Sequence, residues 1–295
     1  MREDLVSGDE LLDQEKIKSL WESQPQVVRS FPGLTNLNTL VIIEPDREPR
    51  LVGEGSFLSP RRDYDNVIIT RLMIQILSAL LQACTSPHNL TLKVSVGGMF
   101  LWHMGAECSR QLEFRALLVG LTHLELHGKH HGHPYRSEQH RQSNCRCGLR
   151  DVMIAARNLE SLALNFSALI DHESGFKMVA DSLDHQELRR LHLETVDLED
   201  DEALQQIFIR HQATLKDVSF HDIYHNNGTW GSIFAGFRDM PQLDRLPLSN
   251  LDDMDRQLNF PTYIAADGSH KGGTSVEATN RADVEKLLKA AEIYR

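Results

Sequence analysis

The 295-residue sequence has little cysteine, few aromatic residues and no long uninterrupted apolar run. Its four cysteines form no disulfide framework, and the acidic residues 1–16 contain no apolar signal-peptide segment, so we expect reduced thiols and a cytoplasmic or nuclear location. The most apolar stretch, residues 67–84, is interrupted by Arg71 and Gln75 and is too short to span a bilayer. We therefore expect no membrane contact.

Positive charge is also scarce, because the formal net charge is −11 at pH 7. Proteins that bind nucleic acids need clustered lysine and arginine, so we expect no nucleic-acid partner. A hydrophobic content of 41% with 25% charged residues is typical of a folded protein of one or two domains.

A six-residue pattern recurs seven times, with apolar residues in its first, fourth and sixth positions, apart from a proline that opens one copy. The copies begin at Leu37, Pro87, Leu121, Leu159, Leu188, Leu215 and Leu243. The last three intervals are 29, 27 and 28 residues, close to the upper end of leucine-rich repeat lengths of about 20–29. Inserted loops explain the longer intervals.

Helical patterns separate these copies. Phe176, Val179, Ala180 and Leu183 share one face of a predicted helix, and similar stripes begin at Leu204, Trp230 and Val284. Each unit is therefore a short strand followed by a helix. The predicted fold class is α/β: an irregular leucine-rich-repeat solenoid with a parallel concave sheet and outer helices.

This pattern divides the chain into four parts. Residues 1–33 form a predicted N-terminal helical cap, and residues 34–251 form the solenoid, with inserted loops at 44–65 and 127–147. Residues 252–279 lack a clear pattern and are predicted to be a loop. Residues 280–295 form a predicted C-terminal capping helix with Asn280 as its N-cap.

Three segments, NLESLAL, the region from ELRRLHLETVDLEDDEALQ to RHQATLKDVSFHDI, and GTWGSIFAGFRDMPQLDRLPLSNL, resemble the irregular leucine-rich repeats of fungal F-box-type proteins. The resemblance covers roughly residues 32–251. It implies that the repeats hold a substrate while an F-box joins a ubiquitin ligase. Residues 1–33 contain no Leu-Pro-rich F-box signature, so the resemblance concerns the substrate-binding part.

Strand alternation predicts which side chains face a partner. If the last two apolar residues of each copy point into the core, the residues beside them form three lateral rows on the concave side, beginning at Thr39, Val41 and Ile43. The predicted partner-binding residues in these rows are His123, Glu125, His127, Asn165, Arg190, His192, Glu194, Asp217, His221 and Arg245.

The function that this pattern favours is a non-enzymatic module, expected to be a monomer without a cofactor, that binds a protein partner. The alternative, that these side chains are polar only because water covers them and have no binding role, remains open.

A second hypothesis is a zinc-binding protein that uses the loop 127–147, which contains His127, His130, His131, His133, His140, Cys145 and Cys147. Structural zinc sites need four converging ligands, typically with two to four residues between cysteines. The CRC spacing and the crowded HGKHHGH segment do not fit, so we predict no metal site.

Two further motifs do not indicate an enzyme. The HDIYH segment, residues 221–225, follows a predicted strand, whereas a zinc-protease motif requires a helix. In DGSHKGGT, residues 267–274, the lysine precedes the glycine pair, so the segment is not a phosphate-binding loop. An unrecognised hydrolase assembled from distant residues remains a third hypothesis.

Overall fold

The computed structural model describes residues 39–43, 90–96, 115, 118–128, 149–165, 175–198, 201–226, 229–253 and 256–291. All of them belong to one compact unit formed by residues 38–44 and 88–295. The predicted cap 1–33, the predicted loop 44–65 and residues 129–147 of the histidine-rich loop lie outside these ranges. No described helix is both long and apolar enough to cross a membrane.

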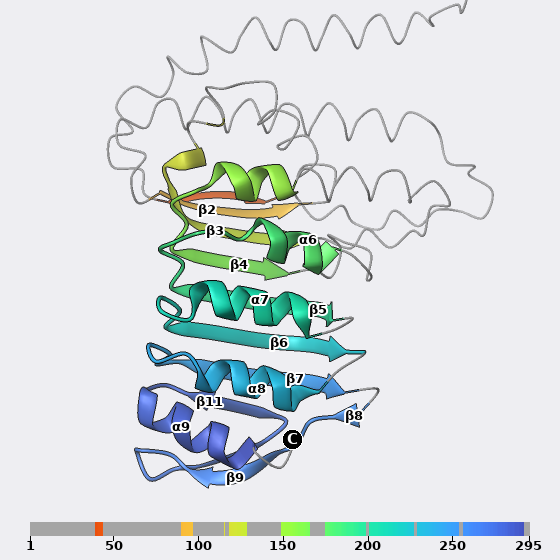
Figure 1. Ribbon diagram of the computed structural model, residues 1–295, viewed down its shortest axis with the longest axis vertical. Coiled ribbons are helices and arrows are strands. Elements are labelled where there is room, and N and C mark those ends of the chain that lie inside the picture. The colour runs from red at the N-terminus through yellow and green to blue at the C-terminus, as the bar shows by residue number, and fades with distance from the viewer. Residues whose placement is uncertain are drawn as a thin grey trace, which may run out of the picture. The chain divides into compact units, whose positions relative to one another are not determined.

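The architecture is mixed α/β with a mostly parallel sheet. Seven strands lie side by side in chain order, and every neighbouring pair is parallel (Figure 1). They are β1 (Thr39–Ile43), β2 (Leu90–Val96), β3 (Leu121–Gly128), β4 (Ser161–Asn165), β5 (Arg190–Leu198), β6 (Asp217–His225) and β7 (Leu246–Asp253). Each copy of the six-residue pattern leads into one strand, as predicted.

Helices follow the strands and lie on one face of the sheet (Figure 1). They comprise residues 149–155, α6 (Gly175–Ser182), α7 (Glu202–His211), α8 (Trp230–Arg238) and α9 (Arg281–Ala290). Successive helices from α6 to α9 contact one another. Thr229 caps α8, since its side chain accepts a hydrogen bond from the backbone N–H of Ser232.

The core lies between the sheet and the helices. From the third copy of the pattern to the seventh, the three apolar residues are buried in every copy, as in Leu121, Leu124 and Leu126. The predicted helical stripes supply the other side, including Phe176, Val179, Ile207, Phe208, Trp230, Phe234, Phe237, Val284 and Leu287. Burying each of these side chains stabilises the fold by about 1.5–3 kcal/mol.

Two buried histidines and the exposed Arg210 link consecutive helices. His185 Nε2 donates a hydrogen bond to the carbonyl of Met153 at 3.2 Å, and His211 Nε2 donates to that of Leu183 at 3.3 Å. Arg210 donates to the carbonyl of Ala180 at 2.7 Å. These contacts add donors to carbonyl groups near the C-terminal ends of the preceding helices, where backbone hydrogen bonding within a helix is incomplete.

The prediction of a loop over residues 252–279 is wrong. This region contains β8 (Arg256–Gln257), β9 (Phe260–Ile264), β10 (His270–Gly273) and β11 (Ser275–Ala278). Strands β9 and β10 pair as a separate antiparallel sheet, whereas β11 adds to the main sheet, antiparallel to β7. The physical reason is burial of a few side chains, Phe260 and Tyr263 in β9 and the alternating pair Val276 and Ala278 in β11.

The predicted C-terminal helix is present as α9. Asn280 is its N-cap, as predicted, and its side chain accepts a hydrogen bond from the backbone N–H of Asp283. Asp283 is itself buried, and its carboxylate accepts hydrogen bonds from the backbone of Ala266 and, at 2.9 Å, from Asn280 Nδ2. The helix therefore anchors the turn that follows β9.

Candidate functional site

The side chains that point away from the helix layer form what we term the polar face. Strand register arranges them in three rows across the sheet, as predicted. Row 1 contains Thr39, Thr91, His123, Ser161, Arg190, Asp217 and Arg245. Row 2 contains Val41, Lys93, Glu125, Ala163, His192 and Ser219. Row 3 contains His127, Asn165, Glu194, His221 and Ser249, and the backbone register continues it to residues 95 and 43.

All ten predicted partner-binding residues lie in these rows, and each is half-buried or exposed, whereas the apolar residues that alternate with them are buried. The structure therefore brings His123, Glu125, His127, Asn165, Arg190, His192, Glu194, Asp217, His221 and Arg245 onto one surface. Adjacent strands lie about 4.8 Å apart, so members of one row can contact the same partner.

Row 1 is held by contacts between strands. Arg245 lies 3.5 Å from Asp217 and 2.8 Å from Glu277 of β11. The hydrogen bond from Arg245 to Glu277 and the charge of Asp217 raise the pKa of Arg245. Arg190 donates to His123 Nε2 at 3.3 Å, which requires an unprotonated acceptor nitrogen. Burial and the charge of Arg190 lower the pKa of His123, consistent with a neutral imidazole.

Rows 2 and 3 share a group of imidazoles and carboxylates. Glu125 lies 2.5 Å from Lys93 and 2.7 Å from His127. Burial opposes ionisation of Glu125, but the hydrogen bonds from Lys93 and His127 prevail and lower its pKa. The carboxylate of Glu125 is thus ionised at neutral pH and pairs with both neighbours.

His192 lies at the centre of this group, with its side chain 38% exposed and 3.8 Å from Glu194. Burial lowers the pKa of His192, and the neighbouring imidazoles of His127 and His221 lower it further, against the opposing effect of Glu194 and Glu125. We refer to Glu125, His127, His192, Glu194 and His221 as the imidazole–carboxylate group. Within the residues that the structure describes, no three histidine, cysteine or acidic side chains are placed to hold a metal ion.

A backbone feature repeats beside row 3. Thr195, Asp222 and Asn250 follow the row 3 residues of β5, β6 and β7, and their φ angles are 55°, 51° and 50°. This left-handed conformation is uncommon for residues other than glycine, and asparagine and aspartate tolerate it best. Asn250 Nδ2 donates to Asp222 Oδ1 at 2.9 Å and joins two of these positions.

The left-handed residues shift the alternation of buried and exposed side chains along each strand by one position. The next buried residues are Val196, Ile223 and Leu251. The residues after them, Asp197, Tyr224 and Asp252, pair across the three strands, and we call them row 4. Tyr224 is 42% exposed. Sequence analysis missed row 4, Asp222 and Glu277, because a strict period of two cannot be continued through the shift or into β11.

One serine–histidine contact lies on the polar face. Ser249 Oγ and His221 Nδ1 are hydrogen-bonded, and His221 Nε2 lies 3.2 Å from Asp222. An acyl-transfer site also needs donors for the oxyanion, often the backbone N–H after the nucleophile. Here that group, Asn250 N–H, already donates to the carbonyl of Thr274 at 3.0 Å. The backbone N–H that most often serves as an oxyanion donor is therefore already engaged within the sheet.

The rejected HDIYH motif lies within strand β6, so its histidines do not share a helix face. Its last residue, His225, is buried and pairs with Asp201, which also accepts a hydrogen bond from Ser232. Because the carboxylate lies between the histidine and the serine, this contact has no nucleophile–base pair. It connects the end of β6 with the start of α7 and with α8.

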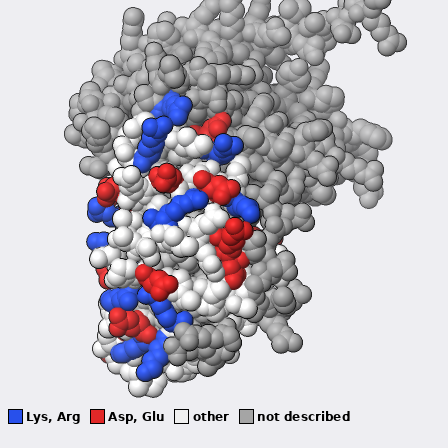
Figure 2. Space-filling model, in the orientation of Figure 1, with Lys and Arg blue, Asp and Glu red and all other residues white. Residues whose placement is uncertain are grey.

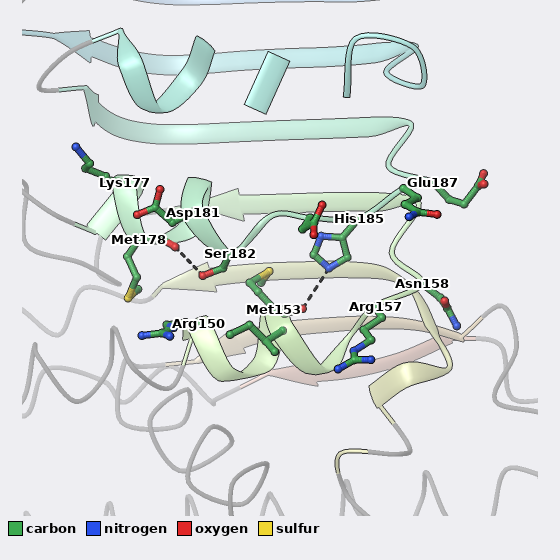
Figure 3. A pocket seen from close by; sticks show the side chains of 13 residues that line it. Arg150, Met153, Arg157, Asn158, Lys177, Met178, Asp181, Ser182, His185 and Glu187 are labelled. Atoms are coloured by element: carbon green, nitrogen blue, oxygen red, sulfur yellow. Dashed lines mark hydrogen bonds between the residues drawn. The ribbon is translucent and has the colours of Figure 1, made fainter. Parts of the chain in front are cut away.

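A groove of about 970 Å³ lies on the helix side between residues 149–158 and 177–187 (Figure 3). Its lining mixes cations such as Arg157 and Lys177 with anions such as Asp181 and Glu187. Ser182 Oγ donates to the carbonyl of Met178 at 2.7 Å rather than to His185. The groove therefore does not contain an activated serine, and the polar face remains the stronger candidate.

Searches against models of known protein families and against curated proteins found no match to this chain.

Proposed function

We propose that this chain is an irregular leucine-rich-repeat solenoid that binds a protein partner through its polar face without acting as an enzyme. The repeated six-residue pattern supports a solenoid, as does the order of the sheet, in which each strand pairs with its predecessor and successor along the chain. In such a protein every repeat contacts only its neighbours, and the sheet presents an extended surface.

The observation that carries the proposal is the register of the three rows. Ten polar or charged side chains from β3 to β7 lie on one surface, and many are fixed by contacts such as Lys93–Glu125, Arg245–Glu277 and Arg190–His123. Side chains that are already ordered lose less conformational entropy when a partner binds. A protein partner, rather than a small ligand, fits a surface that extends over several strands.

The resemblance to fungal F-box-type proteins adds a role to this proposal. The partner would then be a substrate that the repeats present to a ubiquitin ligase. The cytoplasmic or nuclear location expected from the sequence would agree with that role.

The experiment is affinity capture with the full chain as bait and a matched pair of variants. The H192A/E194A variant removes the centre of the imidazole–carboxylate group. The K177A/E202A variant removes an exposed ion pair of 3.6 Å that joins α6 and α7 on the helix side. We expect a partner that the wild type and K177A/E202A retain and that H192A/E194A loses. Equal capture by all three proteins would contradict the proposal.

A further inference from the structure

Charges are distributed unequally along the polar face. Its described lysine and arginine residues belong to rows 1 and 2, and each has a partner: Lys93 contacts Glu125, Arg190 contacts His123, and Arg245 contacts Asp217 and Glu277. In β5, β6 and β7, row 3, the left-handed positions and row 4 contain no lysine or arginine. They contain the carboxylates Glu194, Asp197, Asp222 and Asp252.

An exposed aromatic ring lies among these carboxylates. Tyr224 occupies the middle of row 4, between Asp197 and Asp252 on the two neighbouring strands. Slight burial and the charges of Asp222, Asp252 and Asp197 raise its pKa. A tyrosine face beside carboxylates attracts lysine and arginine, since the ring binds cations and the carboxylates accept their hydrogen bonds.

The carboxylate of Asp222 is also oriented before any partner arrives. Asn250 donates to Asp222 at 2.9 Å, and Gln257 Nε2 of β8 donates to Asn250 Oδ1 at 3.3 Å. This chain of amide groups fixes one carboxylate oxygen of Asp222. Its other oxygen lies 3.2 Å from His221 Nε2.

We infer that the partner contacts rows 3 and 4 of β5, β6 and β7 with a segment rich in lysine and arginine. One cation of this segment packs on Tyr224. This inference rests on the proposed function. Charge complementarity selects this occupant, because a net charge of −11 and the carboxylates of this region repel acidic partners. On the helix side, the described residues in the view of Figure 2 show blue and red side chains interspersed.

The test is a direct binding measurement with defined probes. Fluorescence anisotropy would follow the full chain binding a labelled decapeptide of alternating arginine and serine, with a decapeptide of alternating glutamate and serine as the comparison. We expect saturable binding of the arginine peptide and none of the glutamate peptide. Three lost contacts in the D197N/D222N/D252N variant should raise the Kd about tenfold. Asparagine tolerates the left-handed backbone at position 222, which protects the fold.

The matched control is D181N/D184N/E187Q, which makes the same change in net charge at exposed positions on the helix side. It should change the Kd by less than about twofold. Y224A should weaken binding further than Y224F, because only Y224F keeps the aromatic face.

Two outcomes would overturn the inference: equal weakening by D181N/D184N/E187Q and D197N/D222N/D252N, or failure of the arginine peptide to bind the wild type. Either outcome leaves the proposed function separately testable, because affinity capture that depends on His192 and Glu194 does not require a basic partner. Thermal unfolding of each variant would verify that it is folded.

Discussion

Asn250 and Asp222 lie on neighbouring strands, both with left-handed backbones, and a hydrogen bond of 2.9 Å joins their side chains. A left-handed residue other than glycine costs roughly 1–2 kcal/mol unless its side chain compensates. The pair therefore combines an unfavourable backbone with a stabilising contact between β6 and β7. Thr195 continues the feature on β5 without the amide or carboxylate that the other two provide.

The first prediction concerns Asn250. Replacement by alanine removes the hydrogen bond and retains the backbone cost, so the free energy of unfolding should fall by about 1–3 kcal/mol. Replacement by glycine also removes the hydrogen bond but relieves the backbone, so N250G should lose less than N250A. Urea denaturation of the two variants measures the difference. Equal losses of unfolding free energy in N250A and N250G would show that the left-handed backbone at this position does not affect stability.

Gly236 gives the second prediction. A Cβ at this position in α8 would lie 2.6 Å from Cδ2 of Phe208 in α7. The ring of Phe208 cannot move aside freely, since it packs against Phe237 with centroids 4.9 Å apart. G236A should destabilise the protein by about 1–3 kcal/mol through overpacking, despite the better helix propensity of alanine.

A double-mutant cycle identifies the cause of this loss. The smaller side chain in F208L should offset part of the effect of G236A, so the two free-energy changes will not be additive. Additive changes would contradict a direct clash between positions 208 and 236.

Comparison of the sequence with the structure shows which features local patterns determine. The rows were predictable because the leucine pattern has fixed spacing, so burial of Leu191 and Leu193 leaves Arg190, His192 and Glu194 on the other face. Row 4 was not predicted, because a left-handed residue such as Asp222 lengthens the apolar spacing from two residues to three, and a strict alternation cannot be continued through that step. A signal existed in ETV, HDI and SNL, where two polar residues precede an apolar residue at equivalent positions in β5, β6 and β7.

Strand β11 was missed for a different reason. Its four residues SVEA contain two small apolar side chains, and its place beside β7 depends on long-range pairing such as Val276 with Leu248. Local propensity cannot reveal such pairing. The omission affected the site as well, because β11 supplies Glu277 to the ion pair with Arg245.

The third prediction concerns the buried histidines of the helix layer. Burial lowers the pKa of His185 and of His211 below the ordinary value of 6.5. As the pH falls below 6.5, the unfolded chain takes up protons at these positions before the folded chain does. The free energy of unfolding should therefore decrease as the pH falls from 7 to about 5.5, and increase again on return.

Glutamine variants separate this effect from carboxylate titration. Glutamine can donate to the same carbonyl groups but cannot gain a proton. The pH dependence of stability in H185Q/H211Q should be shallower than in the wild type over the same interval. If both proteins lose stability in parallel, then the two imidazoles do not cause the loss.

The last prediction links the histidines of the polar face to the charge of the partner. Burial and the neighbouring imidazoles His127 and His221 lower the pKa of His192, whereas Glu194 and Glu125 raise it. His192 therefore gains its charge only below the ordinary value of 6.5, and that charge would appear beside the carboxylates proposed to hold a basic segment. Affinity for the arginine peptide should be constant from pH 8 to 7 and fall by a few-fold towards about pH 5.5. In H192Q the fall should be smaller at equal ionic strength, because one added charge is missing. An increase in affinity on acidification would be incompatible with a basic partner, since protonation of the polar face makes it more positive whichever histidine titrates first.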